Sequence, residues 1–376
     1  MVMRTDVKRF NAADVGLSAN MNRGTLLMFF KAILATGYNS KVANITNVNG
    51  NIVTLDYGVP HGYALHRILK ISGNPLLNGE HAVTSMNTNT LTIELENTVT
   101  ISGTVTTQVA PLGFELVYEA TNVAIYKFNY KGKEKYLRLY ETPNYNAYIN
   151  PSVGDGFDVN SGTLTGDIYP TSSISTQNPY RWDFNSSPTG VPFELPSIFG
   201  TSEGFVLIGQ MLSSARQTYI HGILPWHTVF DKLKTPILIC AEISSYSTSH
   251  GSNIDSRNFY LPIIGKVHSQ FYESAINNTG FSDAALTSPV GNSIPDTILG
   301  FNTVSYSSLV IQQYQTNQIL GIANGVHSCL TNITTANNTL SKIIESYDAI
   351  SNEKIWLRKL DFSYRYIVMT PYEGFN

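Results

Sequence analysis

The sequence predicts a mainly β protein, with a β-sandwich or barrel-like core, one short N-terminal helix, long loops and a small inserted all-β module. Three observations lead to this prediction. Apolar and polar residues alternate between Val42 and about Ala110, which is the period of a strand with one buried face. Gly, Pro, Asn and Ser residues separate these runs at short intervals, as turns between strands require. Clear helical spacing is confined to one stretch near the N-terminus.

That stretch predicts a helix over residues 26–36. Its apolar residues recur three and four positions apart, at Leu26, Phe29, Phe30, Ile33 and Leu34. Thr25 precedes them as the candidate N-cap, and Gly37 follows them at the C′ position. The residues before the helix show no period, so we expect residues 1–22 to form an extended N-terminal arm.

Residues 40–112 are predicted to form an inserted module, a small β-barrel or sandwich. Asn49-Gly50 lies between two alternating runs and predicts a type I′ hairpin. Further strands are expected at Ile68–Ser72, His81–Ser85, Leu91–Glu96 and Thr98–Thr106. The pattern changes again at Pro111, so we expect residues 23–39 and 113–376 to form the main β-rich domain around the insert.

The main domain is expected to combine strands with long loops. The strand candidates are Phe114–Ala120, Val123–Tyr130, Lys135–Tyr140, Phe205–Gly209, Ile237–Ile243, Tyr260–Gly265 and Trp356–Met369, with a hairpin at Tyr130–Glu134. Residues 142–200 carry seven prolines and predict a loop-rich region whose function is contact. Residues 311–350 fit both loops and a helix, and Leu340–Ile350 is the most helical piece.

The composition limits the possible partners. Charged residues make up 14% of the chain, below the roughly 25% of an average domain, which suits a surface covered by neighbours. A net charge of −3 and the lack of a basic stripe argue against direct contact with nucleic acid. The N-terminus lacks a signal-peptide core, and no apolar run approaches the roughly 20 residues of a membrane span. We therefore expect a protein that is made in a cytoplasm and is not inserted in a membrane.

Residues capable of nucleophilic or metal chemistry are present, but their patterns do not support a site. Gly200–Gly204 has the five-residue pattern of a nucleophile elbow around Ser202, yet a strand pattern follows it where a helix is required, which favours a plain turn. Cys240 and Cys329 lie in apolar surroundings, which favours buried free thiols over a disulfide. Metal-binding spacing is missing among the eight histidines, which are His61, His66, His81, His221, His227, His250, His268 and His327.

Carboxylates and aromatic residues allow a carbohydrate-related interpretation. Asp155 and Asp158, with Asp167 further on, could form the carboxylate pair of a glycosidase, but a chain of this size offers such pairs by chance. The aromatic clusters Tyr145–Tyr148 and Tyr180–Trp182 could stack on sugars, although we favour interface or core positions for them. Because phosphate-binding and EF-hand motifs are also missing, we expect no catalytic, cofactor-binding or metal-binding residues.

Several segments, taken in order, resemble a family of uncharacterised structural proteins of tailed bacteriophages. The segments are Gly24–Asn39, Pro60–Gly62, Leu77–Ser85, Ala120–Tyr126, Tyr136–Glu141, Asp158–Pro170 and Phe205–Gly209. The order of these motifs carries the resemblance, which weakens after Gln270. Gln210 stands where the family pattern has an acidic residue.

The resemblance implies a virion component. We therefore expect a non-enzymatic structural protein of the tail, baseplate or head–tail neck region, which forms a homo-oligomer and packs against other phage virion proteins. The alternatives are a tail protein that binds a host-surface carbohydrate or receptor, and a capsid decoration protein. Residues 1–22 and 142–200 are expected to lie on neighbouring subunits, because contacts there would offset a backbone ordering cost of roughly 1–2 kcal/mol per residue.

Overall fold

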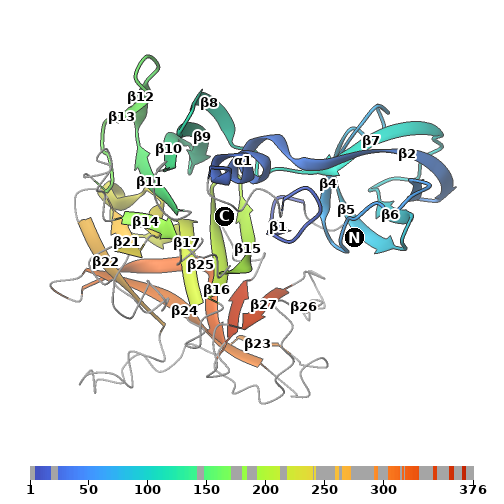
Figure 1. The fold of residues 1–376 in the computed structure, drawn as a ribbon. Coiled ribbons are helices and arrows are strands. Elements are labelled where there is room, and N and C mark those ends of the chain that lie inside the picture. The colour runs from blue at the N-terminus through green and yellow to red at the C-terminus, as the bar shows by residue number, and fades with distance from the viewer. Residues whose placement is uncertain are drawn as a thin grey trace.

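The chain folds into a body of two β-sheets and a closed β-barrel that projects from it (Figure 1). The predicted mainly β class with one short N-terminal helix is confirmed in the described residues. A computed structural model describes residues 5–17, 24–141, 148–170, 180–183, 193–211, 218–239, 241–242, 259–261, 265–271, 292–294, 304–313, 316, 318–329, 342–344, 355–359 and 366–369.

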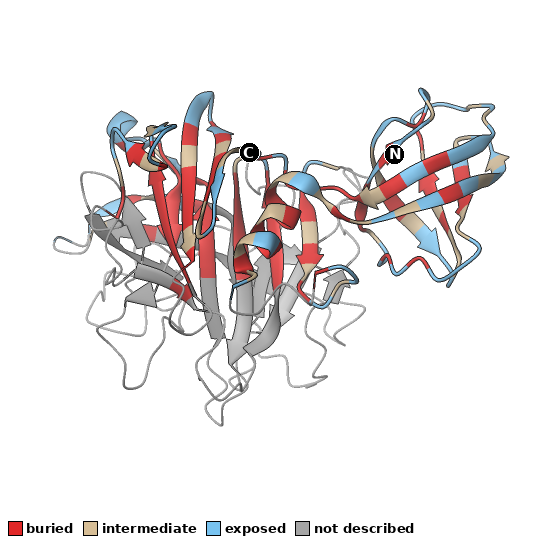
Figure 2. Ribbon diagram, turned by 45° about the horizontal axis from the view of Figure 1, so that its top comes forward, coloured by how far each residue is buried: buried red, intermediate tan, exposed pale blue. Residues whose placement is uncertain are grey.

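The barrel closes in the strand order β2-β3-β6-β5-β4-β7. Its strands are β2 (Tyr38–Asn49), β3 (Ile52–Asp56), β4 (Ile68–Ser72), β5 (Gly79–Met86), β6 (Thr90–Glu94) and β7 (Gly103–Val109). Alternate residues such as Val53, Leu55 and Ile93 fill the interior, and the burial pattern of Figure 2 shows this alternation along the strands. The expected strand at Thr98–Thr106 begins later, at Gly103.

The predicted turn type is wrong at one hairpin, and the predicted hairpin is present at another. In the barrel, Asn49 pairs with Ile52, so the turn consists of Gly50 and Asn51. Of these two residues only Gly50 has a positive φ, 66°, which fits a type II′ turn and not the predicted type I′. In the body, Lys131 and Gly132 have φ values of 49° and 79°, and they form a type I′ turn inside the predicted Tyr130–Glu134 hairpin.

Within the described residues, the larger body sheet contains fourteen antiparallel strands. Along its main path lie β1 (Lys8–Asn11), β15 (Phe193–Thr201), β16 (Gly204–Met211), β17 (Thr218–Leu224), β19 (Ile237–Ile239), β21 (Phe259–Leu261), β22 (Gly265–Phe271), β24 (Val304–Gln313), β25 (Ile319–Cys329), β28 (Tyr366–Met369), β27 (Ile355–Lys359) and β26 (Lys342–Ile344). In addition, β18 (Trp226–Thr228) pairs with β25, and β23 (Asn292–Ile294) pairs with β24. A short 3₁₀ turn, η3, covers Asp231–Leu233.

The second body sheet contains six strands in the part of the chain that the structure describes. In spatial order they are β20 (Ala241–Glu242), β14 (Tyr180–Asp183), β11 (Tyr148–Gly154), β10 (Lys133–Glu141), β9 (Val123–Tyr130) and β8 (Glu115–Ala120). A separate hairpin is formed by β12 (Gly156–Asp158) and β13 (Thr163–Thr165).

Several predictions for the second half of the chain are wrong. The expected loop region 142–200 contributes strands to both body sheets. Residues 311–350 fitted both loops and a helix, yet their described part contains the end of β24, all of β25, and β26. The single strand expected at Trp356–Met369 is the antiparallel pair β27–β28, and the one expected at Tyr260–Gly265 ends at Leu261. Short segments take the structure that their sheet neighbours impose, because strand preference depends on cross-strand packing more than on the segment itself.

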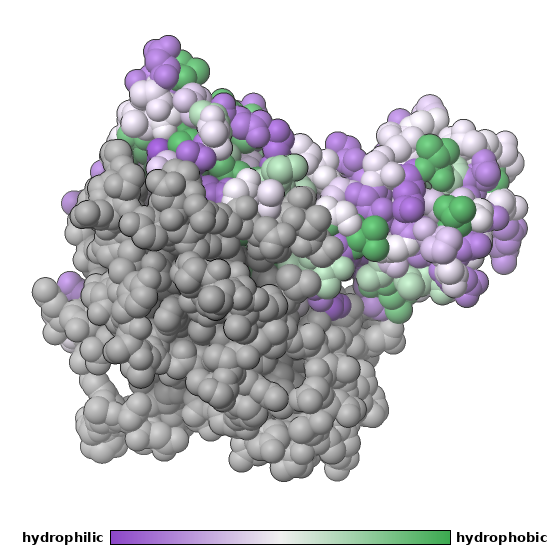
Figure 3. Space-filling model, viewed as in Figure 1, coloured by the Kyte–Doolittle hydropathy of each residue, from purple (hydrophilic) through white to green (hydrophobic). Residues whose placement is uncertain are grey.

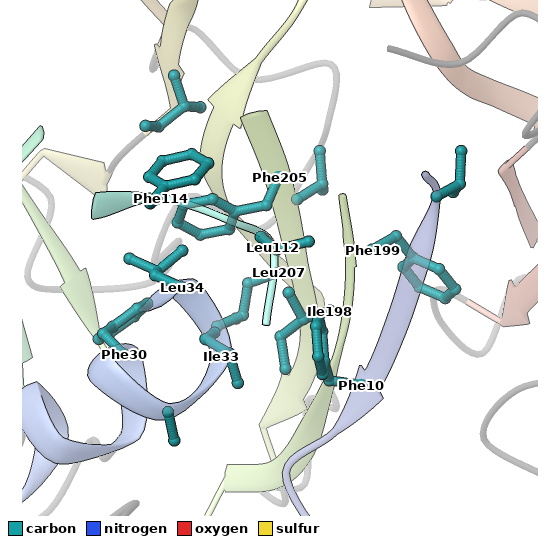
Figure 4. Close-up of a cluster of buried hydrophobic side chains, with 14 of the residues drawn as sticks. Phe10, Phe30, Ile33, Leu34, Leu112, Phe114, Ile198, Phe199, Phe205 and Leu207 are labelled. Atoms are coloured by element: carbon teal, nitrogen blue, oxygen red, sulfur yellow. The ribbon is translucent and has the colours of Figure 1, made fainter. Parts of the chain in front are cut away.

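The predicted helix is present as α1 (Leu26–Lys31) followed by a π-helical turn, η2 (Ala32–Thr36). Its Phe30 packs between the two body sheets, with ring centroids 5.4 Å from Trp182 on β14 and 6.3 Å from Phe205 on β16 (Figure 4). Thr25 occupies the predicted N-cap position, but its side chain makes no cap hydrogen bond. Glu141 performs this role, accepting hydrogen bonds from the backbone N–H groups of Gly24 and Leu27 at 2.5 and 3.4 Å.

The chain leaves the body for the barrel and returns at adjacent points. Gly37 has a φ of 76°, and a Cβ there would lie 2.5 Å from the carbonyl oxygen of Val109, so this position requires glycine. On the return, the N–H of Leu112 donates to the carbonyl of Ile33 at 2.8 Å. The barrel's ends thus lie side by side, as an insertion requires, and independent folding of residues 40–112 stays a prediction.

The N-terminal segment differs from the extended arm that we expected. In its described part, β1 pairs with β15 of the same chain, and Phe10 lies opposite Ile198 (Figure 4). Val7, Phe10 and Leu17 are buried in the common core. These residues are too unevenly spaced to give a periodic signal, but together they offset the ordering cost within a single chain.

Candidate functional site

The geometry around Ser202 is that of a hairpin turn. Thr201 pairs with Gly204, so Ser202 and Glu203 form a two-residue connection between β15 and β16. A Cβ at Gly200 would lie 2.6 Å from the carbonyl oxygen of Gly204, so close strand packing accounts for the glycine at this position of the motif. Because a strand follows Ser202 in place of a helix, the arrangement lacks the geometry of a nucleophile elbow.

The described histidines do not gather into one site. His61 is buried in the connection between β3 and β4, where its Nδ1 accepts a hydrogen bond from the Tyr63 N–H at 3.0 Å and its Nε2 contacts the Asn87 carbonyl at 2.8 Å. His221 is buried on β17 and stacks against Trp182. His227 lies on β18. The described ranges hold no group of three or more His, Cys, Asp or Glu side chains that could bind a metal ion.

Other histidines and the cysteines give less information. His268 and His327 are placed only as backbone positions on β22 and β25, and His250 lies outside the described residues. Cys240 also lies outside them, and Cys329 ends β25 without a described side chain. The predicted free thiols therefore stay a prediction. Within the described ranges, no helix is long and apolar enough to cross a membrane.

Two of the three candidate carboxylates, Asp155 and Asp158, stabilise an ion pair and a turn. Asp155 pairs with Lys135 and accepts a hydrogen bond from the backbone N–H of Asp167 at 3.2 Å. Asp158 accepts hydrogen bonds from the Asn160 N–H and the Ser161 hydroxyl, both at 2.9 Å, and these bonds lower the pKa of its carboxyl group. Such bonding stabilises the β12–β13 turn and accounts for Asp158 without catalysis.

One aromatic cluster contributes Trp182 to the core, and most of the other lies outside the described residues. Trp182 is fully buried, and its Nε1–H donates to the Ile239 carbonyl at 2.6 Å. This places Trp182 in the core, as we favoured, and excludes it as a surface platform for sugars. Residues 142–147, which include most of the Tyr145–Tyr148 cluster, lie outside the described residues.

A buried polar junction fixes the barrel to the body, and sequence reasoning missed it. Lys8 of β1 pairs with Glu80 of the barrel at 2.7 Å. Arg67, just before β4, pairs with Asp14 at 2.7 Å, and Asp14 also accepts a hydrogen bond from the Tyr38 hydroxyl at 2.6 Å. Pairs so far apart in the sequence leave no local signal. The N-terminal segment thus bridges the body and the barrel and holds them in one orientation.

The clearest candidate for an interaction surface lies at the paired ends of β18 and β25. Thr228 pairs with Gly321, and the hydroxyl of Thr228 donates to the Leu320 carbonyl at 2.7 Å. Four apolar side chains around this pairing are exposed, namely Val229 (88%), Phe230 (36%), Ile319 (47%) and Ile322 (46%). We call them the β18–β25 apolar group. Gathered apolar side chains of this kind mark contact surfaces more often than scattered ones do.

Comparisons with known proteins give little further guidance. No protein-family model matches the chain, and no curated protein matches it. Among solved structures, the chain is similar to one described as "Phage phi92 endosialidase", with 11% identity, a TM-score of 0.16, and coverage of 88% of this chain and 51% of that one. The chain therefore spans about half the length of that protein. A likeness this weak carries no argument about fold or activity.

Proposed function

We propose that this chain is a structural subunit of a tailed-phage virion, in the tail, baseplate or head–tail neck region. It would act without catalysis, by packing against copies of itself and against other virion proteins. The ordered motifs from Gly24 to Gly209 that resemble tailed-phage structural proteins support the assignment to a virion. The low charged fraction of 14% also suits a surface that neighbours cover.

The β18–β25 apolar group is the single observation that carries the packing role. Removing apolar surface from water contributes roughly 25 cal/mol per Å², so four such side chains can supply the core of a subunit contact. The described residues 5–17 pack on their own chain, and the expected contact of residues 1–22 with neighbouring subunits stays a prediction. The proposal therefore rests on β18 and β25, where exposed apolar side chains are described.

Sedimentation velocity of the whole chain over a range of concentrations tests this role. We expect a defined oligomer for the unmodified chain and a smaller species for Val229→Asp/Ile322→Asp. The matched control is Val42→Asp, which introduces the same charge at a barrel residue that is 64% exposed. A chain that stays monomeric at all concentrations, or a double variant that assembles normally, would contradict the proposal.

The virion location has its own test. Mass spectrometry of purified particles of the phage that encodes the chain should detect it at a fixed ratio to the major structural proteins. Its absence from washed particles would refute the location whatever the oligomeric state. Hydrolysis of a small ester that is lost in Ser202→Ala would contradict the non-enzymatic role.

A tail protein that binds the host surface is the second candidate function. The barrel projects from the body and exposes apolar side chains, as the mixed surface in Figure 3 shows for one side. Among them are Val42, Ile52 and Leu76. Binding of the purified chain to host cells, weakened by Leu76→Asp but not by Val229→Asp, would favour this function over a purely structural one.

A further inference from the structure

The six-stranded sheet has a buried polar position on the face opposite α1. Leu137 and Leu139 of β10 belong to the core, and the residue between them, Arg138, points to the other side of the strand. Arg138 pairs in register with Ser152 of β11, so their side chains lie on the same face. Both are buried, with 8% and 0% exposure.

The β12–β13 hairpin covers this position. The Arg138 Nε–H donates to the carbonyl of Gly162 in the hairpin turn at 2.8 Å. Gly162 has a φ of 64°, and a Cβ there would lie 2.4 Å from the Tyr118 ring, so the turn lies directly on β8 and β10. A second contact joins the rings of Phe157 and Tyr136, whose centroids are 5.2 Å apart.

Two polar atoms remain unsatisfied under this cover. Among the described residues, neither Nη1 of Arg138 nor the hydroxyl of Ser152 has a hydrogen-bond partner, although both atoms are buried. The described part of the chain also provides no acidic side chain that pairs with Arg138. Burial lowers the pKa of Arg138, yet a guanidinium remains charged at neutral pH. An unpaired buried cation is costly, and buried polar groups nearly always have partners.

We propose that Arg138 and Ser152 form a binding site for a small carboxylate beneath the β12–β13 hairpin. A guanidinium matches the two oxygens of a carboxylate, and the Ser152 hydroxyl can donate a further hydrogen bond. Among the described residues nothing compensates the single positive charge of this site, which suits a monoanion better than a dianion such as phosphate. The tyrosine rings beside Arg138, including Tyr140 at 5.5 Å, allow the ligand an apolar or sugar-like remainder.

The ligand reaches the site when the hairpin moves aside. The two strands of the hairpin have three residues each and pair with one another in a sheet of their own. A short hairpin that pairs only with itself opens at a lower free-energy cost than strands in the middle of a larger sheet. The site does not depend on the oligomeric packing proposed above, because it lies on β10 and β11 and not on β18 or β25.

Isothermal titration of the whole chain with acetate, glucuronate and inorganic phosphate, at constant ionic strength, tests the proposal. We expect acetate and glucuronate to bind and phosphate to bind more weakly. Arg138→Met should weaken carboxylate binding by about tenfold or more, since it removes a charge-assisted pair. The matched control is Lys133→Met, which removes an exposed cation from the same strand and should leave binding unchanged.

Two milder variants keep the test decisive if Arg138→Met does not fold. Arg138→Lys keeps the charge but loses the planar fork, and Ser152→Ala removes only a hydroxyl. Both variants should weaken acetate binding several-fold. They should also reduce the line broadening that the unmodified chain causes in the NMR signal of ¹³C-labelled acetate. The proposal is overturned if the unmodified chain does not distinguish acetate from chloride, if phosphate binds more tightly than acetate, or if both variants bind as the unmodified chain does.

Discussion

The barrel and the body are built from the same kind of strand but assembled from contacts of different range. Every strand pair of the barrel joins residues between Tyr38 and Val109, and the chain enters and leaves the barrel at one place, where these two residues pair. The body joins distant segments: β1 pairs with β15, and Glu141 caps a helix that starts at Leu26. Local pattern therefore describes the barrel well, whereas the body depends on pairings that only the folded chain creates.

We expect the body and the barrel to lose stability separately when a core side chain is truncated. This is the largest effect that we expect. Phe30→Ala should destabilise the body by about 3–5 kcal/mol, because the ring packs between both sheets. The three tryptophans, Trp182, Trp226 and Trp356, all lie in the body, so their fluorescence during denaturant unfolding reports on the body alone.

Two variants serve as controls for this result. Met28→Ala, on the exposed side of the same helix, should change body stability by less than about 0.5 kcal/mol. Leu55→Ala in the barrel core should destabilise the barrel by about 2–5 kcal/mol and leave the tryptophan transition in place. A common shift of both regions in either core variant would show that body and barrel unfold as one unit.

The junction should control how strongly the two regions are coupled. Asp14→Ala leaves the buried Arg67 guanidinium without its acidic partner and removes the acceptor of the Tyr38 hydroxyl. We expect a loss of about 3 kcal/mol, with hydrogen exchange increasing in residues 5–17 and in the barrel. The exposed pair of Lys31 and Glu119 provides the contrast, and Glu119→Ala should cost less than about 1 kcal/mol. Equal effects of the two variants would mean that the junction has no special role.

The long-range helix cap should give a smaller effect. Glu141→Gln removes the charge that faces the N-terminus of α1 and should reduce body stability by about 1 kcal/mol. Glu134→Gln, at an exposed position on the same strand, should be neutral. Thr25→Ala should also be close to neutral, and if it cost more than Glu141→Gln, the assignment of the cap to Glu141 would be wrong. Urea titration followed by tryptophan fluorescence measures all three variants.

The smallest effect that we expect is a dependence of barrel stability on pH. Burial lowers the pKa of His81, so its protonation favours the unfolded barrel, in which the pKa is about 6.5. Barrel stability should therefore be unaffected above that pH and should fall as the pH drops below it. Barrel signals in two-dimensional NMR during urea unfolding at pH 7 and pH 5 measure this change, and His81→Gln should abolish it.

The body offers a matched case. Burial and the nearby Lys131 lower the pKa of His227, so acidification should weaken the body in the same direction. His227→Gln should flatten the tryptophan-detected response and leave the barrel response intact. If either variant removed both responses, the separation of the two regions would not hold.

The sequence by itself determined the mainly β class, the helix near residue 30 and most strands between 42 and 140. Val123–Tyr130 and Ile68–Ser72 are observed with the predicted bounds, because the alternation of apolar residues in them is strong and their partners are near in sequence. The Lys131–Gly132 turn follows from its residues for the same local reason.

Only the tertiary structure decided where the N-terminal segment lies, which residue caps α1 and what Arg138 faces. Each of these depends on residues far apart in the sequence, such as Phe10 with Ile198 or Glu141 with Gly24, and neither partner carries a mark of the other. Arg138 stands in a strand pattern that predicts one buried face, yet the β12–β13 hairpin buries the second face as well. Periodicity reports which side of a strand is apolar, whereas only packing determines what covers the other side.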